Sequence, residues 1–122
     1  MFTINERKNI FFIILWLMET KEIKIAITTF ENAEQASCFA EHLVREGLLA
    51  CAQIDEPMTS IYNWKGKLEI GKEVRLWMKI KAELVHEVAI KLNELHPYEV
   101  AQWIVLTPES VGREYLKWAY DK

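Results

Sequence analysis

The chain has 122 residues, of which 51% are hydrophobic, so it can build one domain with a substantial core and has no room for two. Its net charge is −3 at pH 7 with both signs interspersed, which argues against a nucleic-acid-binding protein, because such proteins usually carry a basic patch. The two cysteines, Cys38 and Cys51, do not form a CxxC pair and make a poor disulfide scaffold, which favours a reduced, cytoplasmic setting.

Residues 10–18 read IFFIILWLM and include no polar side chain. The stretch is far shorter than the roughly 20 residues that span a bilayer, so we expect no stable membrane insertion. Arg7 and Lys8 precede it as in a signal peptide, but no small-x-small cleavage site follows. A dispensable extension with translation starting at Met18, a membrane-surface anchor and a signal peptide all remain open. We expect residues 1–22 to lie outside the domain.

The domain is expected to begin with a strand, a helix and a second strand. Residues 23–29 alternate between apolar and polar side chains, which is typical of a half-buried strand. Asn32 is a good N-cap for a helix over 33–46, and Gly47 is a natural terminator. The nearly continuous apolar run at 48–54 predicts a strand that is covered on both faces.

A long hairpin follows. A bend or bulge at 55–57 interrupts its first arm, because Pro57 cannot donate to the ladder. A tight turn at Gly66 leads into clean alternation from residue 67 to about 81, with Gly71 as a second expected bulge. Each arm exceeds ten residues, against a typical strand of about 5–6. Long exposed edges invite pairing with another chain, so we expect the hairpin to reach over a neighbouring subunit.

The last third predicts a helix over 83–95 that ends before Pro97, a strand over 100–106, and a final helix capped by Thr107 with proline at its first position. The order is β-α-β-β-α-β plus a C-terminal helix. It predicts an α+β, ferredoxin-like sandwich over 23–122 with a long hairpin between its second and third strands.

Six segments of this plan belong together: TT at 28–29, LLACAQI at 48–54, SIYNWKGKLE at 60–69, EV at 73–74, HPYE at 96–99 and YLKW at 115–118. In this order and spacing they resemble the CutA family, which is named for divalent-cation tolerance. The resemblance covers about residues 23–120. It implies a homotrimer held by the long hairpins, a subunit shaped like PII signalling proteins, and binding of copper or another divalent metal. No base is paired with either cysteine, which argues against nucleophilic catalysis. We expect a binding and assembly protein and not an enzyme.

The candidate metal ligands are His96, Glu99 and Cys51. His96 lies in a turn beside oxygen donors, whereas His42 and His86 lie on predicted helices without HxxxH or HxH spacing. Two simpler roles remain open. His96 could only order the turn before proline, and Cys51 could be a buried hydrophobic residue.

A second expected feature is a cleft or interface between subunits, rich in aromatic and charged side chains. Core packing and cross-strand ion pairing are the alternative roles for these residues. A PII-like trimeric module that binds a small anionic ligand between subunits is the alternative function, although no Gly-rich phosphate loop is present. The candidate residues are Tyr62, Trp64, Lys67, Glu69, Glu73, Lys79, Tyr98 and Trp118.

Overall fold

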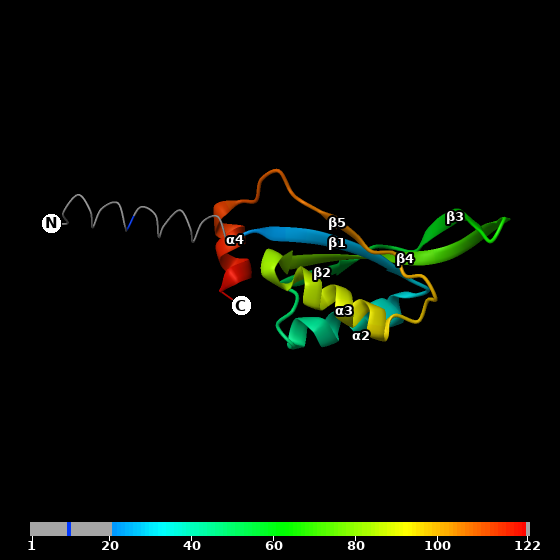
Figure 1. Ribbon diagram of the computed structural model, residues 1–122, viewed down its shortest axis with the longest axis horizontal. Coiled ribbons are helices and arrows are strands. Elements are labelled where there is room, and N and C mark those ends of the chain that lie inside the picture. Colours follow the sequence, from blue (N-terminus) through cyan, green and yellow to red (C-terminus); the bar gives the residue numbers. More distant parts are fainter. Residues whose placement is uncertain (1–9, 11–20, 122) are drawn as a thin grey trace.

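The computed structural model describes Ile10 and residues 21–121. The chain folds into one antiparallel sheet with α2 and α3 side by side on one face and α4 at one end, as Figure 1 shows. This confirms the ferredoxin-like plan with its added C-terminal helix. The elements are β1 (Ile23–Phe30), α2 (Ala33–Arg45), β2 (Cys51–Ile54), β3 (Met58–Trp64), β4 (Lys67–Lys81), a 3-10 turn (Ala82–Leu84), α3 (Val85–Leu95), β5 (Ile104–Leu106) and α4 (Arg113–Tyr120).

The sheet is organised around β4, its longest strand. The strand order is β2-β4-β1-β5, and β3 pairs with the outer half of β4. Strand β1 pairs with β4 from Ile23 opposite Lys81 to Phe30 opposite Val74. Beyond Val74, β4 continues with β3 as its only strand partner among the described residues. The hairpin therefore projects from the body of the sheet (Figure 1).

Local sequence signals explain where α2 begins and ends. The Asn32 side chain accepts a hydrogen bond of 2.9 Å from the Gln35 backbone N–H, as an N-cap should. At the other end, Gly47 takes a φ of 77°, a conformation that favours glycine. The Leu48 N–H then returns to the Leu43 carbonyl at 2.9 Å, which closes the helix.

The core lies between the helices and one face of β4. Its centre is the alternating series of even-numbered side chains on β4. Apolar residues of α2 and α3 cover this series from one side, which explains the helical spacing of those residues. The core members of the three elements are Val74, Leu76, Met78 and Ile80 of β4, Ala36, Phe39, Ala40 and Leu43 of α2, and Val88 and Leu92 of α3.

The expected bulge at 55–57 is confirmed, and the one at Gly71 is wrong. Ile54 pairs with Leu76 and Met58 pairs with Glu73, so three residues of the first arm face two of β4. Gly71 instead sits in unbroken register opposite Ser60. Proline at 57 cannot donate to a ladder, whereas a glycine without a φ constraint can follow the regular pleat.

Two expected strands are shorter than predicted, and the final helix starts later. Strand β2 spans only Cys51–Ile54 and forms an edge with Ile54 exposed, so it is not covered on both faces. Strand β5 spans only Ile104–Leu106. The predicted cap at Thr107 is wrong because α4 begins at Arg113. The Thr107 hydroxyl instead accepts a hydrogen bond of 3.1 Å from Lys24 Nζ, which ties this segment to β1.

Candidate functional site

The candidate metal residue His96 lies where three segments meet. Strand β1 ends here, β4 passes here from the hairpin into the body of the sheet, and the loop after α3 returns to the sheet. The His96 ring stacks on Phe30 with centroids 4.3 Å apart and a 16° angle between the planes. Tyr98 meets the His96 ring edge-on at 4.8 Å. The aromatic series therefore joins the end of β1 to the loop after α3.

Both ring nitrogens of His96 have backbone partners. Nε2 lies 2.7 Å from the Thr29 carbonyl oxygen, and Nδ1 lies 3.1 Å from the Tyr98 backbone nitrogen. A carbonyl can only accept and a backbone N–H can only donate, so the imidazole must be neutral with its proton on Nε2. Burial lowers the pKa of His96, while the bond to Thr29 and the charge of Glu73 act in the opposite direction. The ring therefore orders this turn, and a metal ion at either nitrogen would have to displace one of these bonds.

Glu73 forms the polar part of the same junction. Its Oε2 accepts a hydrogen bond of 2.6 Å from the Ser60 hydroxyl across the hairpin. It also shares a hydrogen bond with the Tyr98 hydroxyl. Burial, followed by the charge of Glu73, raises the pKa of Tyr98 well above its usual range. Two neutral hydroxyls thus hold a half-buried carboxylate and link the base of the hairpin to the loop after α3.

The other two candidate metal ligands lie elsewhere or face solvent. Glu99 is exposed in the loop after α3. Cys51 pairs with Lys79 on β4. Thr29, whose carbonyl contacts His96, pairs with Arg75, four residues away along the same strand. That separation is about 13 Å at the usual rise of a strand. Within Ile10 and residues 21–121, no three His, Cys, Asp or Glu side chains cluster so as to hold a metal ion.

The predicted cleft residues separate into two groups. Tyr62 faces Glu69 and Trp64 faces Lys67 across the hairpin, all on one side of it, with Glu73 and Tyr98 at its base. Lys79 and Trp118 lie apart from this group. Lys79 hydrogen-bonds to Gln53 on β2. Trp118 lies on α4, with its ring 5.5 Å from that of Tyr115.

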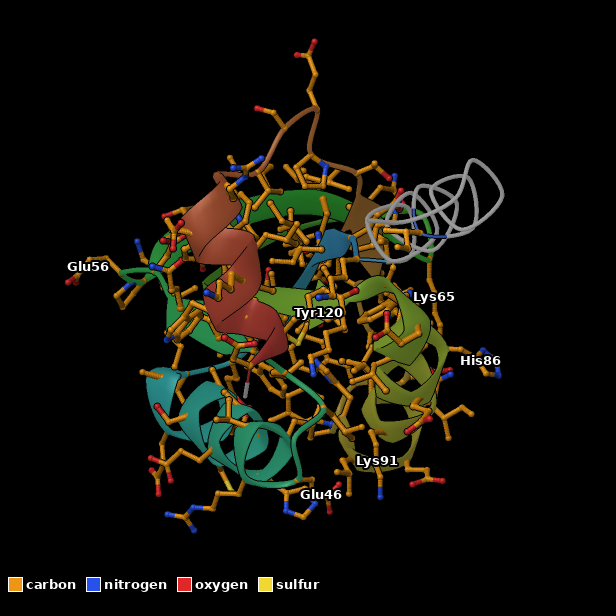
Figure 2. All side chains as sticks on the ribbon, turned by 90° about the vertical axis from the view of Figure 1, so that its left-hand side faces the viewer. Glu46, Glu56, Lys65, His86, Lys91 and Tyr120 are labelled. Carbon is orange, nitrogen blue, oxygen red and sulfur yellow. The ribbon has the colours of Figure 1, made fainter. Side chains whose placement is uncertain are left out.

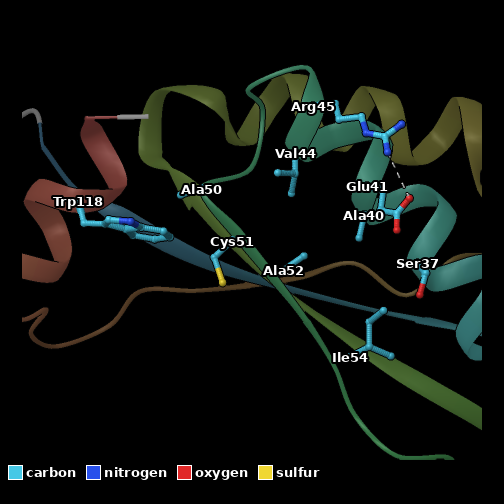
Figure 3. Close-up of a pocket in the computed structure, with 10 residues that line it drawn as sticks. All are labelled: Ser37, Ala40, Glu41, Val44, Arg45, Ala50, Cys51, Ala52, Ile54 and Trp118. Atoms are coloured by element: carbon cyan, nitrogen blue, oxygen red, sulfur yellow. Dashed lines mark ion pairs between the residues drawn. The ribbon is translucent and has the colours of Figure 1, made fainter.

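A shallow groove of about 420 Å³ runs along the open edge of β2, a feature that the sequence did not indicate (Figure 3). Helix α2 forms one wall with Ala40 and Val44, and Trp118 closes one end. Cys51 lines the groove and shares a hydrogen bond with Tyr115. Burial, followed by the interaction with Cys51, raises the pKa of Tyr115. The sequence places Val44 on the apolar stripe of α2, but only the structure shows that it is exposed and makes this flank of the helix apolar surface.

Comparison with known proteins identifies the family. The model of the CutA1 divalent ion tolerance protein matches residues 24–122. This chain belongs to that family. The divalent-cation tolerance protein CutA of Pyrococcus horikoshii is 37% identical over 98 residues, which is 80% of this chain and 95% of that protein. Mouse (Mus musculus) protein CutA is 36% identical over 81% of this chain, but this chain spans only 56% of the mouse protein.

Solved structures of CutA proteins share the fold. The P. horikoshii CutA1 crystal structure superposes with a TM-score of 0.76 at 35% identity, covering 80% of this chain and 95% of that one. The periplasmic divalent cation tolerance protein CutA of Archaeoglobus fulgidus gives 0.77 at 26% identity, covering 81% and 96%. These matches confirm the predicted family and favour it over the PII-like ligand-binding alternative. In the described part of this chain, no helix is both long and apolar enough to cross a membrane.

Proposed function

We propose that the chain acts without enzymatic activity, as a homotrimer in the cellular response to divalent metal ions. Membership of the divalent ion tolerance family supports the metal response. The two free cysteines, Cys38 and Cys51, favour a cytoplasmic location, because a reducing compartment keeps thiols unpaired.

The observation that carries the assembly is the aliphatic face of the hairpin. Ile61 pairs directly with Ile70, and Leu68 lies on the same face. These three side chains are 67%, 64% and 72% exposed. Covering each would contribute roughly 1.5–3 kcal/mol, so a subunit that covers this face gains substantially.

Unpaired strand edges support the same conclusion. The outer half of β4 has β3 on one side. Its other edge, which β1 pairs in the body, has no strand partner past Val74 among the residues that the structure describes. Strand β5 lies at the end of the sheet with Ile104, Val105 and Leu106 all exposed. Open edges of this kind add strands from another chain, which satisfies backbone groups as well as covering apolar surface.

Replacement of hairpin residues tests this assembly. We expect Ile70→Lys to shift the full-length protein from trimer to monomer in sedimentation at micromolar concentration. The matched control is Ile90→Lys on α3, which is also an exposed isoleucine (44%) and should leave the trimer intact. A trimer that survives Ile70→Lys would exclude the hairpin face as the contact.

Metal binding is the second part of the proposal. We propose modest binding of copper or another divalent ion, with none essential for the fold and His96, Glu99 and Cys51 as the candidate ligands. Only a neutral imidazole can ligate, and burial lowers the pKa of His96 below the reference value of roughly 6.5, so binding should fade only as the pH falls below that reference value.

A Cu(II) titration separates ligation by His96 from its structural role. Wild type, His96→Ala and His86→Ala are compared, each with its oligomer mass checked. His86 is exposed on α3 and points away from the body (Figure 2), so its replacement should change nothing. Equal affinity in wild type and His96→Ala would remove His96 from any metal site.

A further inference from the structure

The exposed side of α2 presents a row of potential metal donors that neither the fold nor the proposed function uses. Four residues spaced by four, Glu34, Cys38, His42 and Glu46, are all exposed. Residues four apart on a helix are neighbours, with Cβ atoms about 5–6 Å apart. The thiol of Cys38 and the imidazole of His42 therefore lie one helical turn apart on the same face.

One ring nitrogen of His42 is held by a carboxylate. Its Nε2 lies 3.0 Å from Glu46 Oε1. The other carboxylate oxygen of Glu46 lies 3.9 Å from Lys91 Nζ on α3. Figure 2 shows Glu46 and Lys91 side by side where the two helices come together below the sheet. Metal-bound histidines usually donate their second N–H to a carboxylate in this way, which fixes the ring and its tautomer.

We propose that Cys38 Sγ and His42 Nδ1 bind a thiophilic cation of the Zn²⁺ class on the surface of α2. Thiolate and imidazole are the donors that such borderline-soft ions prefer. Glu46 acts as a positioning residue through its bond to Nε2, which leaves Nδ1 for the metal. The thiol loses its proton to solvent as the Sγ–metal bond forms.

This site has two protein donors, and water fills the remaining positions. No third His, Cys, Asp or Glu joins the pair in a metal-binding cluster within the described range of the chain. Affinity should therefore be weaker than that of closed four-ligand zinc sites. The site lies on α2 and not in the loop of His96, so it does not rest on the metal site or the trimer proposed above.

Spectroscopic titration of the full-length protein carrying Cys51→Ser, with Co²⁺ followed by Zn²⁺, tests the proposal, because this background lacks the thiol that the proposed function names as a candidate ligand. We expect a thiolate-to-cobalt charge-transfer band that saturates at one Co²⁺ per chain and disappears on addition of Zn²⁺, which binds such donors more tightly. Cys38→Ser should abolish the band, and His42→Gln should weaken binding at least tenfold. Glu46→Gln should weaken binding by about tenfold, the low end of the effect of second-shell partners on metal affinity. All three residues are exposed, so these variants should fold.

The absence of a thiolate band in the Cys51→Ser background, or a band that persists when Cys38→Ser is added to it, overturns the proposal. An unchanged affinity in His42→Gln also overturns it, since the pair would then be a lone thiol beside an ordinary surface ion pair. Retention of the band in His96→Ala and in the monomeric Ile70→Lys variant separates this site from the proposed function.

Discussion

Strand β4 passes through two regions with the same pattern and opposite environments. In the body, Leu76 and Met78 are fully buried under the helices, whereas Leu68 and Ile70 in the hairpin are 72% and 64% exposed. All four occupy even positions on the same face of one continuous strand. Alternation thus reveals which side chains share a face, but whether that face is covered depends on the helices of the same chain or on a second chain.

The largest expected difference between the regions is in folding stability. Leu76→Ala should lower the free energy of unfolding by about 2–5 kcal/mol at any protein concentration, because it leaves a cavity in the body. Leu68→Ala should instead lower the urea midpoint by an amount that depends on protein concentration, because Leu68 would be buried only in the proposed trimer. Urea unfolding at two concentrations distinguishes them. A small, concentration-dependent effect of Leu76→Ala would contradict the assignment of the core.

Two tryptophans extend the comparison to the assembly. Trp64 on the hairpin is 37% exposed. Trp77 in the body is held by its own chain, because Nε1 donates to Asp55 at 2.7 Å and the Arg75 guanidinium lies 5.7 Å from the ring. Trp64→Ala should weaken the trimer at least tenfold, as loss of a buried interface tryptophan often does. Trp77→Ala should weaken it less. The reverse order in a dilution series would place the contact outside the hairpin.

The junction between the regions should respond to acid. Burial lowers the pKa of His96 below its ordinary 6.5, so the unfolded chain takes up this proton at a higher pH than the folded one. The contribution of neutral His96 to folding stability is therefore fully present above about pH 6.5, and it is lost as the pH drops from there to the folded-state pKa. Thermal unfolding between pH 7.5 and 5 measures this.

Replacement of His96 by glutamine should flatten that profile. The control His86→Gln, on the exposed side of α3, should reproduce the wild-type curve. An unchanged acid response in His96→Gln would show that protonation of this ring does not destabilise the junction.

The smallest effect is expected at the N-terminus, whose residues before Lys21, except Ile10, lie outside those that the structure describes. A chain that starts at Met18 should unfold and assemble like the full-length protein. Within residues 21–121, contacts that anchor the start of the domain are at Glu22, whose N–H lies 3.0 Å from the Tyr120 hydroxyl and whose carbonyl accepts from Ala82 at 2.8 Å. A chain that starts at Ile25 should be unstable, because it lacks Glu22 and the buried Ile23. Insolubility of the Met18 chain would make the extension structural.

The sequence predicted the elements with a strong local cause. Asn32 and Gly47 bound α2 almost as expected, and the bulge before Pro57 follows from the missing N–H of proline. The errors occurred where tertiary contacts override local signals. The cap signal at Thr107 failed because that hydroxyl bonds to Lys24 from the other end of the domain. Such a bond joins residues 83 positions apart, so no local pattern predicts it.

The candidate site was predictable in part. The turn with His96 and Tyr98 was identified, but its link to Glu73 and Ser60 depends on the register of the hairpin. The row of donors on α2 has a sequence signal in the four-residue spacing of Cys38 and His42. Spacing between histidines alone does not reveal this pair, because the second donor is a cysteine.

Native mass spectrometry of the full-length protein tests whether three chains assemble through the hairpin. The exposed apolar face of the hairpin would be buried by a neighbouring subunit in the proposed trimer. We predict a complex of three chains of 14.4 kDa each for the wild type and a single chain for Ile70→Lys. A wild-type mass of a single chain at micromolar concentration would contradict the account, because the exposed half of β4 would then have no partner.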